Sequence, residues 1–178
     1  MKFSAERLVQ PLMPTPTKPY SIHKMKNFYG ENYLAYVTDE EFFFPDGCLI
    51  TSCTDLDGYI THANEAFVIM SGWERSELIG APHSILRHPD MPAVAFKGLW
   101  DTLARGEKWH GYVKNLRKDG GFYWVYATVI PNIRKGEMRG YTSVRRKPSR
   151  EKIIQAEQLY QTMLSEEKNQ TDRLIRIN

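Results

Sequence analysis

The segment RHPDMP, residues 87–92, combines an arginine, a histidine and an aspartate with two prolines. The planar guanidinium of Arg87 suits a phosphate, a carboxylate or a ring carbonyl. His88 could stack on a ring, donate a hydrogen bond or ligate iron. Asp90 precedes a helical pattern that starts after Pro92, so it is also suited to cap that helix. The segment therefore predicts either one wall of a binding site or a charged turn before a helix.

Four further side chains could line a pocket for a planar ligand. Asn64 lies where a strand pattern gives way to a helix, and its amide could cap that helix or both donate to and accept from a ligand. Trp100 lies on the apolar stripe of a helix, where most tryptophans are core residues. Alternation along a strand places Trp109 and Asn115 on one face, with a gap at Gly111 between them.

The elements that must position these residues follow from turn chemistry and periodicity. CLITSCT and YITHA flank a turn at residues 55–58 and predict a hairpin. NEAFVIMSG, WERSELIG and AVAFKGLWDTLARG predict helices. WHGYVKNLRK, FYWVYATVIP and RGYTSVRR predict three strands joined by turns at residues 119–120 and 135–136. The fold class is therefore α+β, with one domain at residues 48–147.

Two flanking segments lie outside this pattern. Residues 1–47 predict an extension or linker, because four prolines within the first 20 positions exclude regular helix. Residues 148–178 predict a helix with an apolar stripe formed by Ile153, Ala156, Tyr160 and Met163. The stripe is typical of a signalling or dimerisation helix, although it could equally pack on its own domain.

Composition restricts the class of protein. The 178 residues carry a formal net charge of +3 without long runs of like charge, which does not favour nucleic-acid binding. Cys48 and Cys53 point to opposite faces of a strand, so we expect reduced thiols in a cytoplasmic protein. The sequence shows neither a signal peptide nor an apolar run of membrane-spanning length. It also lacks the nucleophile, phosphate-loop and metal-ligand patterns of enzymes.

The motifs THANEAFVIMSGW, LIGAPHSILRHPDMP, AFKGLWDTLARGEKWHGYVKN and KDGGFYWVYATVIP resemble the flavin-binding PAS module of the aerotaxis and energy-taxis receptor family. The resemblance covers roughly residues 49–147. It implies a five-stranded antiparallel sheet with short helices over one face and a pocket between them. It also implies that this pocket holds FAD non-covalently, and that Asn64, Arg87, His88, Asp90, Trp100, Trp109 and Asn115 bind it.

The resemblance further implies a redox or energy sensor. The aerotaxis receptors of this family continue into a membrane anchor and a signalling domain, whereas this sequence ends at Asn178. Some split energy-taxis systems keep the PAS protein and the receptor on separate chains. We therefore expect a stand-alone sensor that signals to a chemoreceptor or transducer on another chain, reaches a membrane only through that partner, and could form a homodimer. Asn115 is the residue we expect to sense reduction, because a proton added at flavin N5 turns an acceptor into a donor and forces a facing amide to reorient.

Two alternatives share the fold. One is a haem-binding gas sensor in which His83 or His88 ligates iron. The other is a cofactor-free interaction module whose own side chains fill the pocket. The colour of the purified protein would separate all three.

Overall fold

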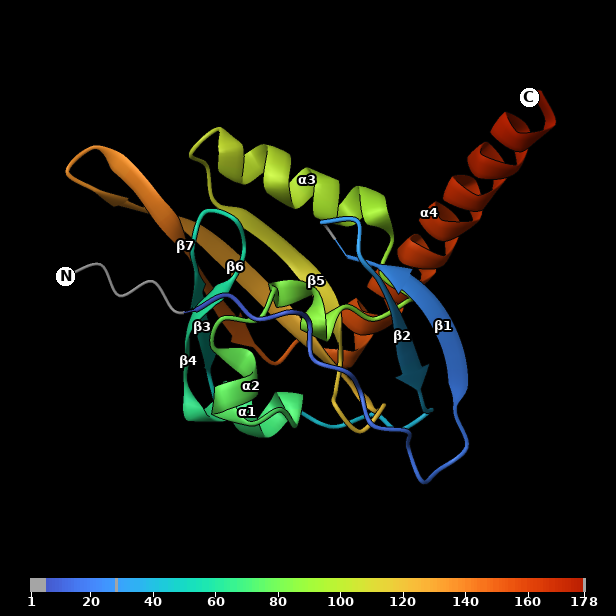
Figure 1. Cartoon of the computed structure of the whole chain (residues 1–178), viewed down its shortest axis with the longest axis horizontal. Coiled ribbons are helices and arrows are strands. Elements are labelled where there is room, and N and C mark those ends of the chain that lie inside the picture. Colours follow the sequence, from blue (N-terminus) through green and yellow to red (C-terminus); the bar gives the residue numbers. More distant parts are fainter. Residues whose placement is uncertain (1–5, 28, 178) are drawn as a thin grey trace.

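The computed structural model describes residues 6–27 and 29–177, with side chains described up to residue 169. A five-stranded antiparallel sheet forms its centre, with strand order β4-β3-β7-β6-β5 (Figure 1). The strands are β3 Ile50–Thr54, β4 Ile60–Ala63, β5 Trp109–Leu116, β6 Phe122–Arg134 and β7 Glu137–Arg146. The predicted α+β class and five-stranded sheet are confirmed.

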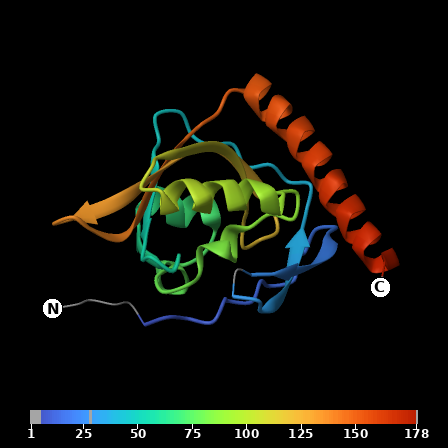
Figure 2. The same cartoon turned by 90° about the horizontal axis from the view of Figure 1, so that it is seen from above.

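Short helices cover one face of this sheet. They are α1 Glu65–Ser71, α2 Arg75–Leu78, the 3₁₀-helix η1 His83–Leu86, and α3 Ala93–Ala104. Figures 1 and 2 show α3 lying across the sheet, with α1, α2 and η1 beside it. The main core lies between these layers. Ile50, Tyr123 and Val125 from the sheet are buried there together with Phe67 and Leu86 from the helical side.

A two-stranded hairpin lies within the segment predicted as an extension. Strands β1 Ser21–Lys26 and β2 Asn32–Val37 pair antiparallel. The amide oxygen of the buried Asn27 accepts hydrogen bonds from the backbone N–H groups of Tyr29 and Glu31, which fixes the turn. This hairpin was not predicted, because its turn has no Asn-Gly or Asp-Gly pair directly between two strand patterns.

The arm before β1 crosses the helical layer. The backbone N–H of Leu8 donates to the carbonyl of Gly80 at 2.9 Å, and the side chain of Met13 packs on the main core. A Cβ at Gly80 would lie 2.2 Å from the carbonyl oxygen of Glu6, so the arm passes where only glycine leaves room. The arm therefore packs against the domain at a defined position.

The C-terminal helix α4, Arg150–Ile177, lies on the opposite face of the sheet from α3 and extends beyond its edge (Figures 1 and 2). The predicted stripe packs on its own domain, with Ile153, Ala156 and Tyr160 buried around Trp124. The Tyr160 ring stacks on Trp124 at a centroid distance of 6.3 Å. Within residues 6–27 and 29–177, no helix has the length and hydropathy that a membrane crossing requires.

Candidate functional site

A cavity of about 450 Å³ lies between α3, η1 and the helix-facing side of the sheet. This size is in the range of small-molecule and cofactor sites. Four of the residues predicted from sequence line it: Arg87, Trp100, Trp109 and Asn115. Arg87 directly follows η1, Trp100 lies in α3, and Trp109 and Asn115 lie in β5, so the fold brings together side chains up to 28 positions apart in sequence.

Aromatic side chains form the cavity walls. Trp100 meets Tyr141 edge-on at a centroid distance of 5.6 Å. The indole of Trp109 folds back over its own strand, so a Cβ at Gly111 would lie 2.2 Å from the ring. The gap predicted at Gly111 is therefore occupied by Trp109. Phe96 completes this apolar lining from α3.

Polar groups without partners also line the cavity. Within the described side chains, the Nε of Arg87, the Nδ2 of Asn115 and the Oγ of Ser143 are buried and make no hydrogen bond. A backbone bridge joins Arg87 to Asn115, which places their side chains at one end of the cavity. Buried donors almost always have acceptors. The arrangement therefore suits a ligand that presents acceptor atoms to this end.

Arg145 and His83 form a second polar group in the lining; the sequence named His83 only as an alternative haem ligand and did not identify Arg145. Arg145 is 4% exposed, and its guanidinium hydrogen-bonds Ser52 at 3.0 Å and the Nε2 of His83 at 2.7 Å. Burial and the adjacent charge of Arg145 lower the pKa of His83 to about 3, so His83 is neutral and accepts from Arg145. Both side chains line the cavity.

The β1–β2 turn closes one side of the cavity. Tyr29 lines it, stacks on Tyr59 at a centroid distance of 5.0 Å, and donates its hydroxyl to the backbone carbonyl of Asp57. Burial raises the pKa of Tyr29 well above its usual range, so the hydroxyl stays protonated. The hairpin that was read as part of an extension thus contributes to the site.

Three predicted residues lie outside the cavity lining. The Asn64 amide caps α1, accepting from Phe67 N at 3.0 Å and Thr51 N at 3.1 Å and donating to the Leu49 carbonyl at 2.9 Å. His88 and Asp90 lie beyond the lining, at the junction between η1 and α3.

His88 and Asp90 belong to a charge cluster beside the cavity. Lys114, with a side chain only 8% exposed, donates to Asp90 at 2.7 Å. The backbone N–H of Asp90 donates to the Nδ1 of His88 at 3.1 Å. Burial and the charge of Lys114 lower the pKa of His88 to about 3, so the ring is neutral. Burial alone would raise the pKa of Asp90, but the hydrogen bond from Lys114 and nearby positive charges hold it below its usual range.

The helix cap expected from Asp90 is not formed. The N-cap of α3 is Pro92, and no side chain at that position accepts a hydrogen bond. The carboxylate of Glu167, far along α4, instead accepts from the backbone N–H groups of Ala93 at 3.3 Å and Val94 at 2.8 Å. Asp90 is directed to Lys114 because a buried ammonium needs a counter-charge more than an exposed helix end does.

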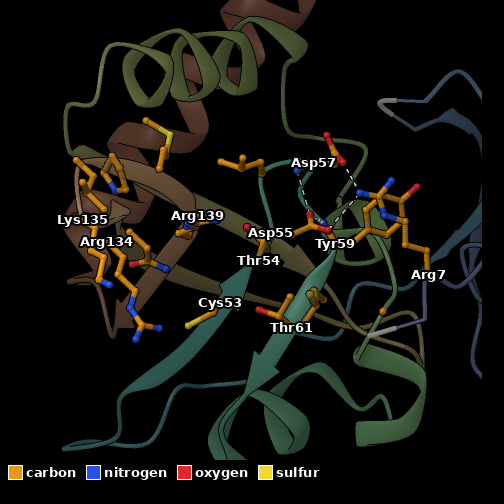
Figure 3. Close-up of a pocket in the computed structure, with 17 residues that line it drawn as sticks. Arg7, Cys53, Thr54, Asp55, Asp57, Tyr59, Thr61, Arg134, Lys135 and Arg139 are labelled. Carbon is orange, nitrogen blue, oxygen red and sulfur yellow. Dashed lines mark hydrogen bonds and ion pairs between the residues drawn. The ribbon is translucent and has the colours of Figure 1, made fainter. Parts of the chain in front are cut away.

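A second, larger hollow of about 1180 Å³ opens between the β3–β4 turn and the β6–β7 hairpin (Figure 3). Several of its charged side chains are paired locally: Arg7 pairs with Asp57 and with Asp55 at 3.4 Å, and Arg139 pairs with Glu137. It contains none of the predicted site residues. Within the described residues, no group of three potential ligand side chains could hold a metal ion.

Comparisons with known proteins agree with this architecture. A family model described as "PAS fold" matches residues 60–145. The chain is 47% identical to the aerotaxis receptor of Escherichia coli (strain K12) over 128 residues, which are 72% of this chain and 25% of the receptor. The chain thus spans a quarter of the length of that relative.

Solved structures share the fold. The light-state structure of the blue-light photoreceptor Aureochrome1 LOV matches with a TM-score of 0.54 and 20% identity, over 67% of this chain and 91% of that one. A structure described as "Flavin Analogue Sheds Light on Light-Oxygen-Voltage Domain Mechanism" matches with a TM-score of 0.52 and 24% identity, over 68% and 87% of the two chains. Two of these similar proteins are named as receptors, one for aerotaxis and one for blue light. Its sheet, its helical layer and the family model that matches residues 60–145 show that this part of the chain is a PAS domain.

Proposed function

We propose that this PAS domain binds FAD non-covalently in the 450 Å³ cavity and senses cellular redox or energy state. The observation that carries the proposal is the set of buried, unpartnered donors on Arg87 and Asn115 at one end of an aromatic slot. A flavin has a planar apolar ring system and one edge of carbonyl and ring-nitrogen acceptors. Similarity to an aerotaxis receptor and to a structure named for a flavin analogue supports this choice.

Different residues of the lining would hold different parts of the flavin. Trp100 and Trp109 offer aromatic faces, while Arg87 and Asn115 offer donors to the acceptor edge. A bound flavin supplies reversible two-electron redox chemistry. Asn115 can both donate and accept, so a change of protonation on the facing atom requires the amide to reorient within a buried site.

The proposal assigns a positioning role, rather than ligand contact, to Asn64, His88 and Asp90. Their polar atoms hold α1 and the junction between η1 and α3, which fixes the backbone that carries Arg87. Direct contact between these three residues and FAD stays a prediction. We assign them this role because the hydrogen bonds of each residue already go to other parts of the protein.

The geometry favours flavin over haem. The Nε2 of His83 already accepts a hydrogen bond from Arg145 at 2.7 Å, and His88 is not part of the cavity lining. A histidine that ligates iron needs a ring nitrogen free and aimed at the metal. The open cavity likewise argues against a module filled by its own side chains.

Signal output is proposed to pass to a chemoreceptor or transducer on another chain. The two redox states must differ in affinity for that partner, because a ligand shifts an equilibrium only through such a difference. The route is the sheet and α4, whose stripe packs against β5 and β6. Homodimerisation, cytoplasmic location and attachment to a membrane through the partner belong to this same proposal.

An absorption spectrum of the purified chain, followed by chromatography of the chromophore released by heat, tests the proposal. Flavin bands with FAD in the supernatant would support it. A single intense band of haem, or a colourless protein that takes up no added FAD, would contradict it.

Asn115→Ala tests the sensing step: we expect the variant to retain FAD but to respond to reduction no longer, measured as partner binding before and after reduction. Asn132→Ala, on the far part of β6, is the matched control.

A further inference from the structure

Arg145 lies in the cavity wall without a negative partner. Its side chain belongs to the inner face of β7, and the residue is 4% exposed. Among the described residues no carboxylate lies within ion-pair distance of it, whereas Arg7 and Arg139, which are both exposed, each have one. The guanidinium stays charged, although burial lowers its pKa to about 10.

The neighbours of Arg145 orient it without neutralising it. Ser52 and the neutral His83 accept two of its hydrogen bonds, and its guanidinium carbon lies 5.2 Å from the centre of the Phe67 ring. His83 in turn stacks on Phe67 at a centroid distance of 6.0 Å. These contacts fix the direction of the guanidinium while leaving a full positive charge in a low-dielectric site.

A buried charge without a counter-charge costs free energy unless something supplies one. Arg87, another cation of the lining, does not supply it and adds a further positive group. The acids that line the cavity, Asp57 and Asp101, are paired elsewhere: Asp57 with Arg7, and Asp101 with Lys97. Within the described residues nothing supplies the missing negative charge, so we expect the occupant of the cavity to present negative charge or acceptor atoms here.

We infer that Arg145 is a binding residue of the cavity that holds the negatively charged or carbonyl-rich end of its ligand, with Ser52 and His83 as positioning residues. This inference rests on the proposed function. For a flavin, the matching end is the pyrimidine edge, which bears N1 and the C2 carbonyl. A planar guanidinium fork suits two adjacent acceptors of this kind.

The assignment has a redox consequence. When oxidised flavin accepts two electrons from a reductant and one proton at N5, the negative charge left over resides at the pyrimidine edge. A cation at that edge stabilises the reduced form more than the oxidised form. Arg145 therefore raises the midpoint potential of the bound flavin above the value that the same cavity would give without it.

The test is a reductive titration of the flavin-loaded full chain with dithionite and a reference dye. We expect Arg145→Gln to bind reduced flavin about tenfold less favourably relative to oxidised flavin, which lowers the midpoint potential by about 30 mV. Arg145→Lys keeps the charge without the fork and should give an intermediate value. Arg146→Gln is the matched control, because Arg146 is exposed on the opposite face of the same strand and contacts Tyr126 there.

The outcomes of this titration separate the proposed function from the inference about Arg145. A wild-type chain that holds no flavin would overturn the proposed function and this inference with it. A flavin-loaded Arg145→Gln variant with the wild-type potential would overturn the inference alone. If that variant does not fold, nitrogen NMR of the wild-type chain decides: the Arg145 side-chain signal, assigned by its loss in Arg145→Lys, must shift on flavin reduction while the Arg146 signal does not. An unshifted Arg145 signal would refute the assignment.

Discussion

Removal of the Glu167 carboxylate should release the far half of α4 from α3. Glu167 accepts hydrogen bonds from the first-turn N–H groups of Ala93 and Val94, which have no partner within their own helix. The perturbation is Glu167→Ala, with Glu167→Gln to separate charge from hydrogen bonding. The neighbouring, exposed Glu166 supplies the matched control, Glu166→Ala.

The structure sets the magnitude. Loss of a side-chain acceptor at a helix start costs about 1 kcal/mol. Loss of a negative charge near the helix N-terminus adds about 0.3–1 kcal/mol in an exposed position. The two sum to about 1–2 kcal/mol, which corresponds to a shift of about 5–30-fold in the population in which α4 is released.

Hydrogen exchange at the Val94 amide is the direct assay, because that N–H donates to Glu167 at 2.8 Å. In Glu167→Ala we expect its exchange to accelerate about 5–30-fold. Glu167→Gln should give a smaller increase, and Glu166→Ala none. Wild-type exchange at Val94 in Glu167→Ala, with folding intact, would refute the contact as a link between the two helices.

Two further predictions concern stability and the cavity wall. Burial lowers the pKa of His83 and His88 to about 3. The unfolded chain therefore binds more protons as pH falls below about 6.5, and the free energy of unfolding must decrease there. Urea titrations on either side of that pH measure the loss, and a flat profile would contradict the burial of two neutral histidines. Gly111→Ala should displace the Trp109 ring and cost about 1–3 kcal/mol, with a changed near-ultraviolet circular dichroism spectrum. Gly98→Ala, where an added Cβ meets nothing within 4 Å, should leave that spectrum unchanged.

The central sheet could be predicted because its hairpins are encoded locally. Each of the three turns, at residues 55–58, 119–120 and 135–136, carries a glycine with positive φ between two apolar strand patterns. The β1–β2 hairpin was missed because its turn depends on the side chain of Asn27. Gly30, with φ +87°, was the one local signal that the region contains a turn.

The site was predictable where strand alternation determines which face a residue occupies. On β5 alternation placed Trp109 and Asn115 together, and both line the cavity. The same alternation on β7 would have placed Ser143 and Arg145 inward, but Arg145 stands in a run of basic residues that is typical of an exposed surface. The role of Asp90 could not be predicted from the local sequence, because its partner Lys114 lies 24 positions away.

The position of Phe96 explains how occupancy of the cavity could reach α4. Phe96 lines the cavity, lies under the Arg87 guanidinium at 4.9 Å, and also packs against the buried cluster that includes Met91 and Tyr160. Tyr160 donates its hydroxyl to the backbone of β5 at 2.6 Å. Close-packed interiors do not absorb a displaced ring without moving its neighbours. We therefore expect a ligand that displaces Arg87 to change the packing of Phe96 on that cluster. Because the cluster includes Tyr160 of α4, the contact between α4 and the sheet should change with it. Phe96→Leu should thus weaken the coupling between flavin reduction and Val94 exchange while leaving the flavin bound, and unchanged coupling in that variant would exclude this route.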